Sequence, residues 1–200
     1  MKRNIQNNKY KGMKRIISVL VLAVAMLTLP LCVSVAQDAV TGATALDDDA
    51  KYAKDLIKPG KVMPDFTLNT LDGKAVKLSS YRGHYVVLDF WASWCPDCRR
   101  DIPNVKRMYK AFADKGVVFI GVSFDDNKEA LSKAVKDLGI EYTQVSELKK
   151  WKSTDTSKKY KINWIPTMYL VGPDGKVVVS TVMSEKVDKE LAKVFPACAE

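Results

Sequence analysis

A continuous apolar run at residues 85–90, followed within five residues by a helical pattern, constrains the fold of this chain more than any other feature. The run does not alternate between apolar and polar residues, which is typical of a strand covered on both faces. From Cys95 onward the apolar residues fall on one stripe of a helix that ends near Gly116. Pro103 lies inside this helix and should kink it. A doubly buried strand followed by an amphipathic helix is typical of an α/β domain.

Further strands and helices are predicted on both sides of this unit. They are a hairpin at 66–68 and 75–78, strands at 117–124 and 141–145, a helix at 127–138, a second hairpin at 167–171 and 176–182, and a helix at 184–195. Strands that alternate with helices pair in parallel, whereas hairpins add antiparallel strands. We therefore predict an α/β fold with a central mixed sheet flanked by helices and an extra N-terminal β-hairpin.

The first 36 residues are typical of an export signal. Residues 1–15 hold six Lys and Arg and no acid, and residues 16–31 are apolar. Ser34-Val35-Ala36 then offers small residues for cleavage before Gln37. We predict a signal peptide at 1–36 and hence an exported, periplasmic protein. An uncleaved membrane anchor is the alternative, because 16–36 is just long enough to span a bilayer.

After the signal segment we predict an N-terminal extension at 37–60 and the main domain at 61–200. The acidic residues 47–49 can start a short helix through Ile57, and Pro59-Gly60 stops it. We expect this extension to be peripheral. A lipid-modified Cys32 is disfavoured, because Leu29-Pro30-Leu31 lacks the small residues of a lipoprotein cleavage site.

The net charge of +9 comes mainly from the signal segment. Without the first 36 residues the chain keeps 26 basic and 23 acidic residues, a net charge of +3. The remaining lysines show no aromatic-basic pattern of the kind that binds RNA. We therefore expect a solvated surface and no nucleic-acid partner.

Cys95 and Cys98 are separated by two residues at the predicted start of a helix. The free N–H groups and the positive dipole end of a helix favour a thiolate, which is the nucleophile in disulfide exchange. Cys198 lies third from the C-terminus, so we interpret it as a bystander. The spacing of Cys95 and Cys98 therefore indicates a redox-active pair rather than a structural disulfide framework.

The sequence Asp89-Phe90-Trp91-Ala92-Ser93-Trp94-Cys95-Pro96-Asp97-Cys98, together with Pro103 and Trp164-Ile165-Pro166-Thr167, resembles thioredoxin. Met63-Pro64-Asp65-Phe66 and the stretch 121–126 are similar to exported TlpA/ResA-like thiol:disulfide oxidoreductases. The resemblance covers about residues 62–195 and implies a thioredoxin-like fold.

The resemblance also implies roles for three residues. Cys95 is expected to be the exposed attacking thiol, and Cys98 should resolve the mixed disulfide. Asp89 matches the buried carboxylate that accepts the proton of the resolving thiol, so we assign it as the general base. Thioredoxins keep a lysine near this acid on the next strand, whereas 117–124 has none. The alternative for Asp89 is a carboxylate at a strand end that bonds to the backbone.

The expected substrate groove is formed by Trp94, Pro96, Trp164, Ile165 and Pro166. In the resembled family the peptide before this proline is cis and places its backbone opposite the cysteines, where substrate strands pair. An ordinary trans proline is the alternative. Trp91 is expected in the core.

These features predict an exported thiol:disulfide oxidoreductase that exchanges its Cys95–Cys98 disulfide with protein thiols and disulfides. Asp97 places a carboxylate near the thiolate, which favours a reductant. The resemblance implies a membrane reductant as electron donor, clients that include apocytochromes, and no organic cofactor. One alternative is a thiol peroxidase. Peroxiredoxin relatives place a Thr or Ser three residues before the reactive cysteine, whereas Ser93 lies only two residues before Cys95.

The other alternative is a non-catalytic module that holds a metal or a client. Zinc needs about four ligands, and His84 is the single histidine, so no metal is expected.

Overall fold

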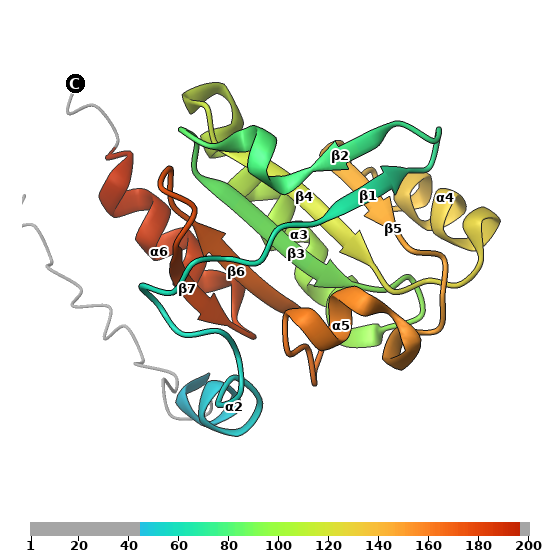
Figure 1. Cartoon of the computed structure of the whole chain (residues 1–200), viewed down its shortest axis with the longest axis horizontal. Coiled ribbons are helices and arrows are strands. Elements are labelled where there is room, and N and C mark those ends of the chain that lie inside the picture. Colours follow the sequence, from blue (N-terminus) through green and yellow to red (C-terminus); the bar gives the residue numbers. More distant parts are fainter. Residues whose placement is uncertain (1–44, 197–200) are drawn as a thin grey trace, which may run out of the picture. The chain divides into compact units, whose positions relative to one another are not determined.

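The computed structural model describes residues 45–196, and within them seven strands form one mixed sheet in the order β2-β1-β5-β4-β3-β6-β7 (Figure 1). The strands are β1 (Thr67–Thr70), β2 (Ala75–Lys77), β3 (Val86–Trp91), β4 (Val118–Ser123), β5 (Thr143–Ser146), β6 (Thr167–Val171) and β7 (Val177–Thr181). The helices are α2 (Ala45–Tyr52), α3 (Pro96–Phe112), α4 (Lys128–Asp137), α5 (Asp155–Lys159) and α6 (Ser184–Val194). The predicted thioredoxin-like α/β fold with an N-terminal hairpin is confirmed.

Strand β3 lies in the interior of the sheet, between β4 and β6, and is buried along its whole length. It pairs in parallel with β4 and antiparallel with β6, and β4 continues in parallel to β5. Because both of its faces are covered, apolar residues occupy both faces, which explains why the run that predicted it does not alternate between apolar and polar residues. The chain leaves β3 at Trp91 and enters α3 after four residues.

Helix α3 packs on the sheet through the predicted stripe. Its buried residues are Cys98, Ile102, Val105, Met108 and Phe112. The Tyr109 ring packs edge-on against Phe119 of β4, with 5.6 Å between ring centroids, so α3 covers the face of the sheet to which Phe119 points. The helix continues through Pro103 and ends at Phe112.

The N-terminal hairpin extends the sheet beyond β5. Strands β1 and β2 pair antiparallel, and Asn69 and Thr70 of β1 pair with Ser146 and Val145 of β5. At the turn, Gly73 adopts a φ of 85°, which a residue with a Cβ rarely adopts. The hairpin is therefore an integral edge of the central sheet.

The described part of the N-terminal extension, residues 45–60, is not peripheral, in contrast to our prediction. Helix α2 ends at Tyr52 rather than Ile57, and Ala53 and Leu56 behind it are buried in the core. The Asp49 carboxylate accepts hydrogen bonds from the Thr181 hydroxyl and the Val182 N–H, at 2.8 Å each. These hydrogen bonds to donors at the end of β7 hold the extension against that strand. Local sequence patterns do not reveal such a contact.

The predicted signal peptide, its cleavage site, Cys32 and Cys198 lie outside the described residues. Among residues 45–196, no helix combines the length and the apolar character that a membrane crossing requires.

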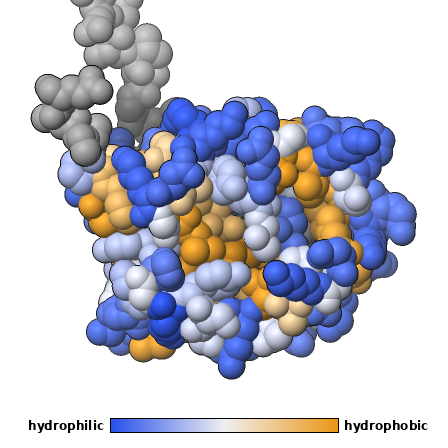
Figure 2. Space-filling view, turned by 90° about the horizontal axis from the view of Figure 1, so that it is seen from above, coloured by the Kyte–Doolittle hydropathy of each residue, from blue (hydrophilic) through white to orange (hydrophobic). Residues whose placement is uncertain are grey.

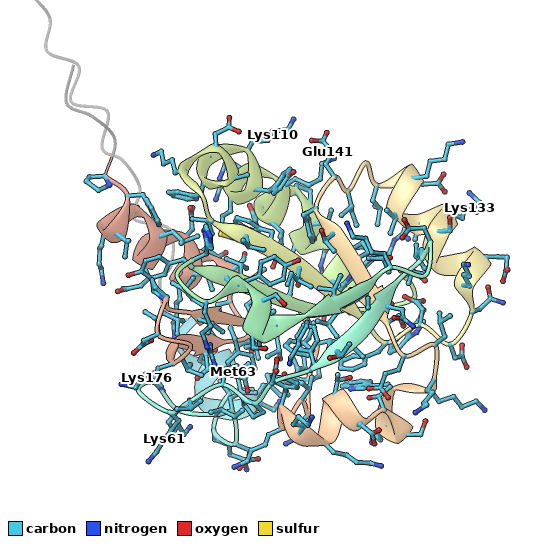
Figure 3. All side chains as sticks on the ribbon, turned by 45° about the horizontal axis from the view of Figure 1, so that its top comes forward. Lys61, Met63, Lys110, Lys133, Glu141 and Lys176 are labelled. Atoms are coloured by element: carbon cyan, nitrogen blue, oxygen red, sulfur yellow. A yellow bond between two sulfur atoms is a disulfide. The ribbon has the colours of Figure 1, made fainter. Side chains whose placement is uncertain are left out.

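The surface follows the charge pattern of the sequence. Figure 2 shows one face of the molecule, on which hydrophilic residues surround smaller apolar areas. In Figure 3 the side chains of Lys61, Lys133 and Lys176 extend outward from the ribbon. Met63, by contrast, is 1% exposed and belongs to the core.

Candidate active site

Cys95 lies at the position that caps the N-terminus of α3. Its backbone is extended, its sulfur accepts the backbone N–H of Cys98 at 3.1 Å, and Pro96 follows as the first helical residue. Cys95 and Cys98 are joined by a disulfide bond. Unpaired N–H groups at a helix start stabilise negative charge, so this geometry favours the thiolate of Cys95 when the disulfide opens.

Both cysteines are covered, and the prediction of an exposed Cys95 is wrong. Cys95 is 4% exposed and Cys98 is 2% exposed. The Sγ atom of Cys95 lies 3.7 Å from the carbonyl oxygen of Ile165, which belongs to the segment before β6. This segment packs against the cysteine from a distant part of the chain, so the sequence neighbours of Cys95 could not reveal its burial.

The Ile165–Pro166 peptide is cis, as we expected. The five residues predicted to line the groove divide into two groups. Trp94 (53% exposed) and Pro96 reach the surface, and Trp164 is half-buried. The side chains of Ile165 and Pro166 are buried, so Ile165 faces Cys95 through its backbone carbonyl rather than through an apolar rim.

A cavity of about 410 Å³ opens beside this segment. Trp164 and Pro166 line one part of it, Asp97 and Asp101 of α3 another, and Met183 a third. The Trp164 ring stacks on Tyr52 of α2, with 3.9 Å between ring centroids. The extension that we expected to be peripheral therefore supports one wall of the cavity next to the cysteines.

Asp89 lies in the middle of β3 and is 2% exposed. The pKa of its carboxyl is raised to about 7, mainly by burial; the hydrogen bond from the Tyr142 hydroxyl opposes this shift, and the nearby Asp101 carboxylate adds to it. This hydrogen bond is 2.9 Å long. The alternative of a carboxylate that bonds to the backbone at a strand end is wrong, because Asp89 is central in its strand and its partner is a side chain.

Three residues around Asp89 were not predicted from the sequence to belong to the site, although Gly121 is part of the family-like stretch 121–126. Gly121 of β4 lies directly opposite Asp89 in the register, at the strand where thioredoxins keep a lysine. Tyr142 directly precedes β5 and Gln144 lies within it, and the Gln144 side chain accepts a hydrogen bond from Trp91 Nε1 at 2.8 Å. The signal in the sequence is the alternation of large polar side chains at 142 and 144, two positions of one strand face.

Asp125 is a second buried carboxylate near the cysteines; in the sequence it belongs to the family-like stretch 121–126, for which no role was predicted. It is 2% exposed and accepts the Ser93 N–H at 2.9 Å, the Ser93 hydroxyl at 2.5 Å and the Ser123 hydroxyl at 2.6 Å. These bonds tie the loop before Cys95 to the end of β4. The carboxylate therefore fixes the start of α3 relative to the sheet.

His84 lies at the other end of β3 from the cysteines, where its Nδ1 is 3.3 Å from the Gly116 carbonyl oxygen. In the part of the chain that the structure describes, no group of three or more His, Cys, Asp or Glu side chains is arranged to hold a metal ion.

A family model described as the AhpC/TSA family matches residues 59–180. The ResA thiol-disulfide oxidoreductase of Bacillus subtilis (strain 168) is 31% identical over 140 residues, which cover 67% of this chain and 74% of the relative. This chain is a thiol-disulfide oxidoreductase of the AhpC/TSA family. The thioredoxin domain of a thiol-disulfide oxidoreductase from Bacteroides vulgatus is 33% identical, with a TM-score of 0.63, over 69% of this chain and 98% of that domain.

A thiol:disulfide interchange protein from a Bacteroides species is also 33% identical, with a TM-score of 0.64, over 72% of this chain and 94% of its own. The oxidoreductase thus shares both sequence and fold with proteins of this activity, and the family predicted from its motifs is confirmed.

Proposed function

We propose that this oxidoreductase reduces disulfide bonds of exported proteins, with Cys95 as the attacking thiol and Cys98 as the resolving thiol. The observation that carries the proposal is the position of Cys95: its sulfur caps α3 and receives the Cys98 N–H. Cys98 lies one helical turn deeper and is the more buried of the two. The sulfur with the better stabilised negative charge is the better candidate for first attack.

The chemistry proceeds in two exchanges. The Cys95 thiolate attacks one sulfur of the client disulfide, and the other client sulfur leaves as a thiolate. The Cys98 thiolate then attacks Cys95, the enzyme disulfide forms, and the second client sulfur leaves. Two electrons pass from the enzyme dithiol to the client, and each released thiolate takes up a proton.

We assign Asp89 as the group that accepts the Cys98 proton before the second exchange. It lies on the sheet face covered by α3, since its hydrogen-bond partner Tyr142 packs against Tyr109 of that helix. Cys98 is buried on the same helix. A carboxylate whose pKa burial raises to about 7 is matched to proton acceptance near neutral pH.

The client is proposed to bind as an extended segment beside Cys95. The Ile165 carbonyl can accept a hydrogen bond from a client backbone N–H, as in strand addition. Trp94, Pro96 and Trp164 supply accessible apolar surface around it, and Pro166 lines the adjoining cavity. This arrangement binds a protein backbone without demanding one client sequence.

We infer the direction of electron flow from Asp97. A carboxylate in the first turn of α3 opposes ionisation of the nearby sulfur, so the reduced pair releases electrons more readily. Arg100 pairs with Asp97 and offsets part of this effect. The proposal predicts a reduction potential more negative than about −200 mV, the range of reducing thioredoxin-like proteins.

The proposed location is the periplasm, with the N-terminal apolar segment either cleaved or retained as an anchor. The basic residues 1–15 and the apolar run 16–31 support export. The electron donor is then a membrane reductant, and the family resemblance makes apocytochromes one class of client. Fractionation of cells that express the full chain with a C-terminal tag tests both the location and the cleavage.

The decisive experiment traps the client. Cys98→Ala leaves Cys95 without its resolving partner, so it should accumulate a mixed disulfide with exported proteins, whereas Cys95→Ala should capture none. Absence of any adduct on Cys98→Ala contradicts the proposal. With the wild-type protein, faster consumption of peroxide than of insulin disulfides would instead support a thiol peroxidase.

A further inference from the structure

Gly121 leaves a gap in the layer of side chains above β4. It lies between Asp89 on β3 and Gln144 on β5 in the sheet register. A Cβ atom at position 121 would overlap the Gln144 side chain, so only glycine lets that side chain cross the middle strand. Residues of β5 can therefore reach β3 over β4, which side chains on the strand between them normally prevent.

Two side chains reach β3 from the β5 side. The Tyr142 hydroxyl donates to Asp89 at 2.9 Å, and the Gln144 amide oxygen accepts from Trp91 Nε1 at 2.8 Å. The Gln144 amide nitrogen donates to the Tyr142 carbonyl at 3.2 Å. The Tyr142 ring, 4% exposed, packs against Tyr109 and Phe119, which fixes the hydroxyl in place.

We propose that Tyr142 is a positioning residue for disulfide exchange: its hydroxyl, which reaches Asp89 beside the Gly121 gap, keeps the Asp89 carboxylate ionised so that it can take the Cys98 proton. This inference rests on the proposed role of Asp89. The proton moves from the Cys98 thiol to Asp89, which leaves a thiolate and a neutral carboxyl. A neutral hydroxyl donor then stabilises the ionised buried carboxylate, at the place where thioredoxins keep a lysine.

The charges around Asp89 make this hydroxyl important. From α3, Asp101 opposes ionisation of Asp89, and the Cys98 thiol is the proton donor. On the neighbouring strands, Gly121 has no side chain and Met168 of β6 is apolar. Within residues 45–196, Tyr142 is the one side chain that donates a hydrogen bond to Asp89.

Tyr142 itself remains a donor throughout the working pH range. Burial and the nearby Asp89 raise the pKa of Tyr142 well above its usual value, so the phenol keeps its proton. A hydrogen bond to the charged form of a buried carboxyl favours that form. Its removal should therefore move the titration of Asp89 to higher pH.

A chromogenic aryl disulfide such as dithiobis(nitrobenzoate) separates the two exchanges. When reduced enzyme is mixed with it, the first coloured thiolate reports attack by Cys95 and the second reports resolution by Cys98. In Tyr142→Phe the first release should be unchanged. The pH midpoint of the second release should rise by about one pH unit, which slows it about fivefold near neutral pH.

Matched variants give this test its controls. Tyr109→Phe removes a hydroxyl from the adjacent ring and should leave both releases unchanged. In an Asp89→Asn background, Tyr142→Phe should have no additional effect on the second release. An unchanged midpoint in Tyr142→Phe, with normal first release, overturns the inference but not the proposed function. Failure of the wild-type enzyme to give a Cys95-dependent first release overturns the proposed function itself.

A ring-fluorinated tyrosine at position 142 covers the case in which Tyr142→Phe does not fold. Fluorine makes the phenol a stronger donor with little change in shape, so the midpoint of the second release should fall. A purely structural role for the ring predicts no movement, and that outcome overturns the inference.

Discussion

The two faces of β3 are built on opposite principles, although their residues alternate along one strand. On one face the Phe90 ring packs against Phe124, Tyr160 and Tyr169, with ring centroids 5.4–6.0 Å apart. On the other face Asp89 and Trp91 each hydrogen-bond a side chain that reaches over from the β5 side. The first face gains stability from apolar contact, whereas the second keeps buried polar groups that are costly without partners. The proposed proton acceptor, Asp89, therefore lies on the face of β3 that carries buried polar groups beneath α3.

Phe90→Ala should have the largest effect on stability. The side chain is completely buried, so its removal leaves a cavity and should lower the free energy of unfolding by about 3–5 kcal/mol. Urea denaturation measures this loss. The exchange rate of the protein that remains folded should be unchanged, since Phe90 faces away from α3. A loss of disulfide-exchange rate larger than the loss of folded protein would show that the Phe90 face also contributes to the exchange reaction, which contradicts this prediction.

Asp89→Asn should stabilise the oxidoreductase at neutral pH. The pKa of Asp89 is raised from 3.8 to about 7 on folding, so the folded state binds more protons than the unfolded chain between these values. Stability therefore falls as the pH rises through this window, and the asparagine variant removes this dependence. Its free energy of unfolding should exceed that of the wild type by about 2–4 kcal/mol above pH 8 and match it near pH 4.

The second buried carboxylate provides the control for this prediction. Asp125 accepts three hydrogen bonds from Ser93 and Ser123, so Asp125→Asn removes an acceptor from donors that need one. This variant should lose about 1–3 kcal/mol at neutral pH. If burial of the Asp89 carboxylate lowers stability and burial of Asp125 does not, the two variants should change the free energy of unfolding in opposite directions. Denaturation of both variants across the pH range measures these changes.

Gly121→Ala should close the gap over β4 through which the Tyr142 and Gln144 side chains reach β3. The new methyl group meets the Gln144 amide, which is held by Trp91 and the Tyr142 carbonyl, and we expect a loss of about 1–3 kcal/mol. Gln144→Ala in the same background should recover part of that loss. Additive losses in the double variant, measured by urea denaturation, would show that the two positions do not compete for the same space.

The same two faces separate what the sequence predicts from what it does not. Local periodicity was enough for β3, α3 and the hairpins, because covered strands and amphipathic helices leave regular patterns. The cysteine pair is predictable because Cys95 and Cys98 are three positions apart at the start of one helix, a spacing that the sequence itself shows. Tyr142 was missed because its pairing with Asp89 depends on the register of three strands.

Contacts between distant segments account for the other differences. Cys95 is covered by the Ile165 segment, 70 residues later in the chain. The extension docks through Asp49, whose partner Thr181 is 132 residues away. Such pairs leave no periodic signal in the sequence. Predictions from local sequence patterns therefore underestimate how much of the site is buried.

Tyr52→Ala should have the smallest effect on stability. It tests whether the N-terminal extension supports the Trp164 wall of the proposed client-binding site. Loss of the stacked contact with Trp164 should cost about 0.5–1.5 kcal/mol, and Tyr52→Phe, which keeps the ring, should cost less. Because Trp164 then loses the ring that holds it, KM for a protein disulfide should rise in Tyr52→Ala. The rate with a small aryl disulfide, which does not need the groove, should stay the same. Equal loss with both substrates would mean that α2 supports the cysteines themselves rather than the client wall.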